Sequence, residues 1–130
     1  DIAPTLLEVC DLPAPDRMQG RSLRSLLNGT GDHPAHRDTV RSEYFRALNP
    51  DQRPNWNGTY ATMIRDRRYK LVVYHGQDTG ELFDLQEDPE EFHNLWEDPG
   101  FRDVRFRLMK QSFDALAFAV DVGPKQTTRF

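Results

Sequence analysis

The side chains of this sequence that could carry chemistry are few and widely spaced. Cys10 is the one cysteine, so it could act as a nucleophile but cannot form an internal disulfide or a thiolate metal cage. It stands among leucines, which favours a buried, inert thiol. His33 and His36 flank Pro34-Ala35 and have aspartates beside them, as metal ligands can. The proline prevents a regular helical histidine face and zinc would need two further ligands, so we expect a solvated loop.

Acidic side chains also gather between residues 87 and 98, where an acid/base pair or a calcium loop could be considered. They lack the alternating ligand spacing of a calcium loop. Asp88, Glu91 and Asp98 stand where helix caps and a capping box are expected. We therefore predict a structural role for these carboxylates.

Three further residues are candidates for contact with a substrate. His75 ends a predicted strand beside Tyr74 and a glycine turn, and Trp56 stands in the irregular segment 47–58. Loops and strand ends commonly carry binding residues. The alternatives are a surface histidine that ends a strand and a tryptophan that covers the core. No nucleophile elbow or phosphate-binding glycine loop occurs, so no catalytic and no metal-ligating residue is predicted.

The composition narrows the class of protein. A chain of 130 residues fits one domain with a core of its own. Its net charge of −4 argues against nucleic acid as a main partner, and no apolar run approaches the roughly 18 residues of a membrane span. The chain begins at Asp1 and enters a helix-like segment at once. We expect an excised part of a larger protein, with a removed leader or tag as the alternative.

The hydrophobic pattern predicts two short helices, an antiparallel sheet and one long helix. The helices are expected at residues 1–10 and 22–27, and the strands at residues 39–45, 60–65, 69–75 and 81–85. Apolar residues on both faces of 69–75 indicate a central strand.

Two Asp-Pro pairs, at residues 88–89 and 98–99, are typical helix starts. After the first we expect a short turn from which Phe92 and Leu95 point inward. After the second we expect a long helix that supplies most of the core, through a stripe at Phe101, Val104, Leu108, Met109, Phe113, Leu116 and Ala117.

Five segments in order cover nearly the whole chain, and together they resemble the C-terminal region of sulfatases in the alkaline-phosphatase superfamily. They resemble the helix that closes the catalytic domain, the G-x-S-L segment, the next strand, the R-t-d-r-y-K-l hairpin and the E-L-Y-D-L-x-x-D-P-x-E-x-x-N-L signature. In this sequence they are residues 1–8, 18–23, 41–44, 63–71 and 81–95.

The resemblance implies an α+β fold. A small antiparallel sheet of about four strands has a C-terminal helix packed across it and is preceded by a helix left over from the catalytic α/β domain. Residues 1–37 would be the tail end of the catalytic domain and a connector, residues 38–122 the sulfatase C-terminal subdomain, and residues 123–130 a loose tail.

The resemblance also implies that the parent hydrolyses sulfate esters with a formylglycine, made from cysteine or serine in a C/S-x-P-x-R motif, and with a divalent cation, usually calcium. Cys10 does not match, because its proline comes one place late and no arginine follows. We therefore expect an inactive fragment without a cofactor of its own. It would buttress the N-terminal catalytic domain and help shape the entrance for a sulfated small molecule or glycan. The alternatives are the C-terminal domain of a phosphonate monoester hydrolase or phosphodiesterase, and a stand-alone interaction module.

Overall fold

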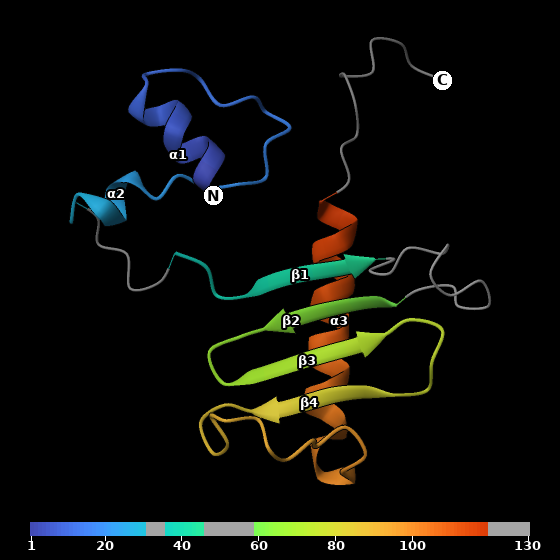
Figure 1. Ribbon diagram of the computed structural model, residues 1–130. Helices are drawn as coiled ribbons and strands as arrows, with labels where there is room; N and C mark the ends of the chain where they lie inside the picture. Colours follow the sequence, from blue (N-terminus) through green and yellow to red (C-terminus); the bar gives the residue numbers. More distant parts are fainter. Residues whose placement is uncertain (31–35, 46–58, 120–130) are drawn as a thin grey trace, which may run out of the picture. The chain divides into compact units, whose positions relative to one another are not determined.

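The computed structural model describes residues 1–30, 36–45 and 59–119 (Figure 1). The chain divides into two compact units, Asp1–Arg37 with Phe118–Phe130 and Asp38–Ala117.

The first unit holds α1 (Ile2–Val9) and α2 (Arg24–Leu27), which are tied together through Thr5. The Thr5 hydroxyl donates to the Asp1 carbonyl over 2.7 Å and accepts from the Leu23 N–H over 2.8 Å. Asp1 occupies the N-cap position, but its carboxylate accepts from the Arg21 N–H at 2.8 Å and does not cap the helix. The Asp1 carboxylate therefore bonds across the connector and leaves the start of α1 without a side-chain cap.

The first helix buries little of its apolar surface within the described residues. Only Pro4 and Thr5 are buried, while Ile2, Leu6 and Val9 are exposed. The expectation of a buried Cys10 is wrong: the helix is eight residues long and Cys10 is its exposed C-cap residue.

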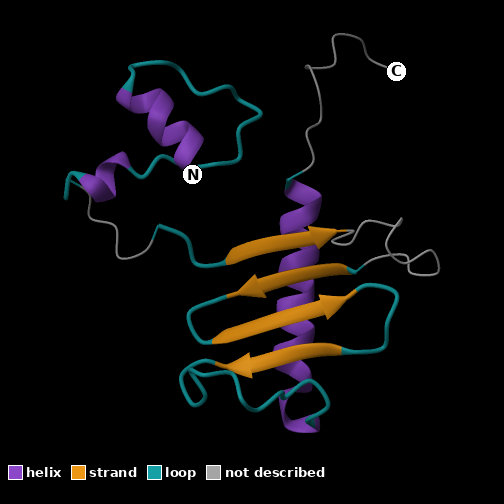
Figure 2. Ribbon diagram, in the orientation of Figure 1, coloured by secondary structure: helices purple, strands orange, loops and turns teal. Residues whose placement is uncertain are grey.

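The second unit is a four-stranded antiparallel sheet crossed on one face by a long helix (Figure 2). Its strands are β1 (Val40–Phe45), β2 (Tyr60–Arg65), β3 (Tyr69–Tyr74) and β4 (Gly80–Asp84), paired in chain order. The helix α3 (Arg102–Phe118) follows a 3₁₀ turn, Pro99–Phe101. This confirms the predicted α+β fold class.

Four fully buried side chains form the core. Ile64, Leu71 and Leu82 stand opposite one another on three adjacent strands, and Leu108 of α3 packs on them. Each is at most 1% exposed. Side chains alternate between the faces of a strand, so one residue from each strand suffices to build the layer that meets the helix.

The expected apolar stripe of α3 is only partly correct. Leu108 and Ser112, four positions apart, are the buried residues of the helix, and Val104 packs beside the core. Met109 and Phe113 each follow this row by one position, which places them about 100° around the helix. Phe113 is accordingly 71% exposed. The helix contributes one fully buried side chain and the sheet three, so the helix does not supply most of the core.

The segment after β4 also differs from expectation, because no helix begins at Asp88. Residues 85–98 form turns, and Glu91 adopts a positive φ of 60°. This left-handed residue reverses the chain, so that Phe92 is 79% exposed while Leu95 packs against the core. The prediction for Phe92 is wrong and that for Leu95 is right. Glu91 pairs with Lys70 of β3 at 2.5 Å rather than completing a capping box.

An ion pair closes the β3–β4 end of the sheet. The Arg68 guanidinium donates to both carboxylate oxygens of the buried Asp84, at 2.7 and 3.0 Å. This bond, helped by the Gln86 N–H, lowers the pKa of Asp84.

We expect Asp84→Asn to lower the free energy of unfolding by about 1–2 kcal/mol at pH 7, because Arg68 loses its charged acceptor. The folded-state pKa of Asp84 lies below its ordinary value of about 3.9. The pair therefore stabilises the fold above that value, and its contribution is lost as the pH falls through the folded-state pKa. Urea denaturation at pH 7 and pH 3 should show the difference from wild type shrinking at pH 3. Asp78→Asn, in an exposed turn, serves as the control.

Candidate functional site

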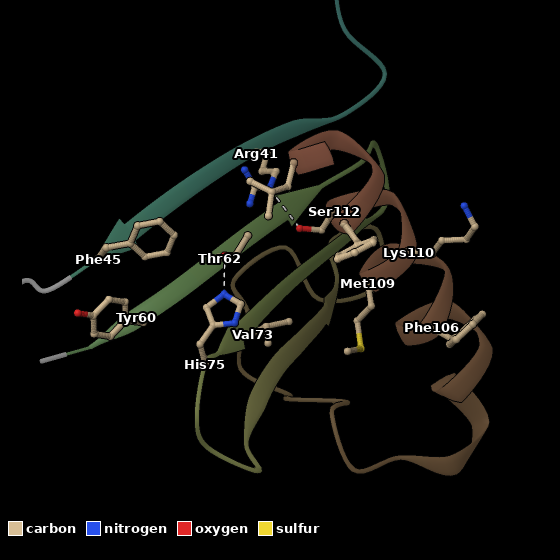
Figure 3. A pocket seen from close by; sticks show the side chains of 12 residues that line it. Arg41, Phe45, Tyr60, Thr62, Val73, His75, Phe106, Met109, Lys110 and Ser112 are labelled. Atoms are coloured by element: carbon tan, nitrogen blue, oxygen red, sulfur yellow. Dashed lines mark hydrogen bonds between the residues drawn. The ribbon is translucent and has the colours of Figure 1, made fainter. Parts of the chain in front are cut away.

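A pocket of about 710 Å³ opens between α3 and the face of the sheet on which α3 lies (Figure 3). It is contained within the second unit. Its walls come from β1, β2, β3 with the residue that follows it, and α3. The lining residues are Arg41, Phe45, Tyr60, Thr62, Val73, His75, Phe106, Met109, Lys110, Ser112, Phe113 and Leu116.

The pocket exists because α3 continues to Phe118, beyond Leu108, the last of its residues in the buried core. On β2 and β3, Thr62 and Val73 stand opposite one another and on the same face as the core residues. Beyond Leu108, the helix presents Ser112 to the sheet, and Ser112 is too small to fill the space above β1 and β2. The apolar side chains Met109 and Phe113 border this space instead of closing it.

Four polar side chains in this pocket are already hydrogen-bonded in two pairs. The Thr62 hydroxyl and the His75 Nε2 lie 2.6 Å apart. Arg41 Nε donates to the Ser112 hydroxyl at 3.3 Å, and its guanidinium also pairs with Glu43. The pocket is therefore a largely apolar cleft in which these four polar side chains already have hydrogen-bond partners.

The lining does not fit the cation that the family resemblance implies. Calcium prefers carboxylate and carbonyl oxygens, whereas the charged residues that line this pocket are the basic Arg41 and Lys110. Within residues 1–30, 36–45 and 59–119, no group of three or more histidine, cysteine, aspartate or glutamate side chains could hold a metal ion. We therefore derive no chemical step through a metal on this chain.

The two candidate residues that the structure describes, Tyr74 and His75, are not brought to one place. His75 lines the pocket, whereas the preceding residue, Tyr74, points to the opposite face of β3 and donates to Glu81 at 2.7 Å. That hydrogen bond raises the pKa of Tyr74. Trp56 lies outside the described residues, as does His33. His36 is described, and its Nε2 lies 3.0 Å from the Asp1 carboxylate.

Sequence reasoning missed the polar residues that line the pocket together with His75, namely Arg41, Thr62 and Ser112. One signal was available for Thr62. In an antiparallel hairpin centred on residues 66–68, Thr62 shares a face with the apolar Ile64 and Val73, so strand alternation places it beside His75. No comparable signal joins Arg41 to Ser112, which are 71 positions apart.

Comparisons with known proteins assign the fold. The family model of the C-terminal region of N-sulphoglucosamine sulphohydrolase matches residues 1–117. Two similar curated proteins come from Bacteroides thetaiotaomicron. An N-acetylglucosamine-6-O-sulfatase is 30% identical over 74% of this chain and 17% of its own length, and a Delta 4,5-hexuronate-2-O-sulfatase is 30% identical over 80% and 20%.

A solved phosphonate monoester hydrolase from Silicibacter pomeroyi has the same fold. Its TM-score is 0.77 at 26% identity, covering 94% of this chain and 25% of that one. The chain thus spans about a fifth of the length of the curated relatives. Among the described residues, no helix is long and apolar enough to cross a membrane. With the family model matching nine-tenths of the sequence, the chain belongs to the N-sulphoglucosamine sulphohydrolase C-terminal family, the C-terminal region of sulfatases in the alkaline-phosphatase superfamily.

Proposed function

We propose that this chain is the non-catalytic C-terminal part of a longer enzyme that hydrolyses sulfate esters. The observation that carries the proposal is the family match over residues 1–117, together with curated relatives that are sulfatases. The catalytic part would supply a formylglycine and a divalent cation, usually calcium. A hydrated aldehyde gives the nucleophile, and the cation stabilises charge on the sulfate oxygens. The substrate would be a sulfated small molecule or glycan.

The role of this part would be to buttress the catalytic domain, with residues 1–37 as the end of that domain and a connector. The exposed apolar residues of α1, Ile2, Leu6 and Val9, support this role. They would be buried against the catalytic α/β domain, since exposed apolar faces mark interaction sites.

The reaction class is tested by assaying the protein at its natural length. We expect turnover of an aryl sulfate and of N-acetylglucosamine 6-sulfate, and little turnover of a phenyl phosphonate monoester. The reverse preference would favour a phosphonate monoester hydrolase, the alternative that the Silicibacter pomeroyi structure supports. Residues 1–130 alone should turn over none of these three esters. Sulfate release by that fragment would contradict the non-catalytic role.

We further propose that the His75 end of β3 forms one wall of the substrate entrance. Of the candidates Trp56, Tyr74 and His75, only His75 lines an opening in the described residues. We expect His75→Ala to raise KM several-fold in the natural-length enzyme and to change kcat less, because the residue would bind substrate without joining the chemistry.

Tyr74→Phe is the matched control for His75→Ala, since Tyr74 neighbours His75 but lies on the other face of the sheet. Its KM should stay at the wild-type value. Thermal unfolding of both variants separates a binding effect from loss of the Thr62–His75 hydrogen bond. Unchanged kinetics of His75→Ala on several sulfate esters would remove His75 from the entrance.

A further inference from the structure

The two edge strands of the sheet, β4 and β1, differ in how the backbone groups of their outer edges are hydrogen-bonded. The outer edge of β4 is closed by the chain that follows it. Asn94 accepts from the Leu82 N–H and donates to the Gly80 carbonyl, both at 3.0 Å, and the Leu95 N–H donates to the Leu82 carbonyl at 2.8 Å. The Asp84 carbonyl accepts from the Asp88 N–H at 2.7 Å. An edge covered in this way offers no template for another strand.

Among the described residues of the second unit, 38–45 and 59–117, β2 is the one strand that pairs with β1, and β1 ends the sheet. His75 donates its N–H to the Tyr60 carbonyl, which fixes the alternation of hydrogen bonds across the sheet. It follows that Val40, Ser42 and Tyr44 bond to β2, whereas Arg41, Glu43 and Phe45 direct their backbone groups outward. The strand has no proline or bulge, and its two charged side chains, Arg41 and Glu43, pair with each other.

Apolar side chains gather at the same edge, on both faces of the sheet. Arg41 bonds to Ser112, so the turns of α3 around Ser112 lie over β1. Phe113 and Leu116 in those turns are 71% and 45% exposed. On the opposite face, Val40 and Tyr44 of β1 are about half exposed. The β1 edge therefore carries apolar surface above and below it.

We propose that β1 pairs antiparallel with β1 of a second copy of this chain, around a two-fold axis at Ser42. This register places Arg41 opposite Glu43 of the other copy twice, and Val40 opposite Tyr44 twice. The outward backbone groups of Arg41 and Glu43 would form about four hydrogen bonds across the junction. Directly opposite pairs of unlike charge stabilise such a junction. Centring the axis on Glu43 instead would place two glutamates face to face.

The pairing joins two four-stranded sheets into one of eight strands and sets both α3 helices on the same side. Phe113 and Leu116 of each copy then approach the junction, while Val40 and Tyr44 cover its other face. A stable dimer needs roughly 1,200–2,000 Å² of buried surface, and the five paired residues of each copy, 40–44, would not supply it alone. The exposed apolar groups on both faces of β1 would add to the buried surface.

Charge reversal tests the pairing in the protein at its natural length, by analytical ultracentrifugation from 1 to 100 µM. The wild-type protein should dimerise. Arg41→Glu and Glu43→Arg should each raise the dimer dissociation constant at least tenfold, because like charges then stand opposite one another. The double variant R41E/E43R should restore dimerisation. Arg65→Glu, at the exposed end of the inner strand β2, should leave it unchanged.

Circular dichroism and thermal unfolding confirm that each variant is folded before its mass is read. A protein that stays monomeric at 100 µM would overturn the proposal and indicate that another part of the longer protein covers β1. An unchanged dimer dissociation constant in both Arg41→Glu and Glu43→Arg would also overturn the proposal. So would a double variant R41E/E43R that stays monomeric.

Discussion

Replacing Leu108 with alanine should destabilise the protein by about 3 kcal/mol, the largest effect expected of any single α3 side chain. Leu108 is fully buried against the Ile64–Leu71–Leu82 layer, whereas Val104 of the same helix is only partly buried there. Three strands hold that layer rigid, so the cavity left by the missing methyl groups cannot close by local movement. Urea denaturation followed by circular dichroism measures the change.

Phe106→Ala is the control for Leu108→Ala, because Phe106 belongs to the same helix but is 71% exposed. Its effect on the free energy of unfolding should stay within about 0.5 kcal/mol. Equal losses in the two variants would contradict the assignment of Leu108 as the buried contact of α3. The loss in free energy of unfolding would then depend on residue size or helix propensity and not on burial.

The apolar stripe of α3 shows what hydrophobic periodicity can predict: the position of a helix, but not which of its apolar residues become buried. Spacings of three and four identified a helix over the correct region, with Val104 and Leu108 among its inward residues. They could not say which half of a wide apolar stripe meets the sheet, because that depends on the width of the sheet and on Ser112. A polar residue at the centre of the contact was not predictable, since its partner Arg41 lies 71 positions away.

The strands were more predictable because each carries its own signals. Residues 60–65 were predicted without error as β2, and the hairpin to β3 follows from the turn at residues 66–68. There Asp66 accepts from the Arg68 and Tyr69 N–H groups at 2.8 and 2.6 Å. Local turn chemistry of this kind can be read from neighbouring residues. The pocket around His75 depends on contacts between distant elements.

The 81–95 segment has one part that neighbouring residues predict, the strand β4, and one part that they do not, the turns after it. The structural role of these turns depends on Asn94. Predicting helix caps at Asp88 and Glu91 was reasonable from residue types, yet the segment folds as an edge cover instead of a helix. The Asn94 amide does what a neighbouring strand would do, since it bonds to both the N–H of Leu82 and the carbonyl of Gly80. Its oxygen also accepts from the Trp96 N–H at 3.0 Å, which holds the turn in place.

Asn94→Ala should therefore lower the free energy of unfolding by about 2–3 kcal/mol, because the N–H of the buried Leu82 loses its acceptor and two further bonds disappear. Asn94→Asp is the matched variant. It keeps the oxygen that serves Leu82 and Trp96 but loses the donor to Gly80, so its loss should be intermediate. Hydrogen exchange at the Leu82 amide should accelerate in Asn94→Ala and much less in Asn94→Asp. Wild-type exchange at Leu82 in Asn94→Ala would mean that the backbone bond from Leu95 alone closes the β4 edge.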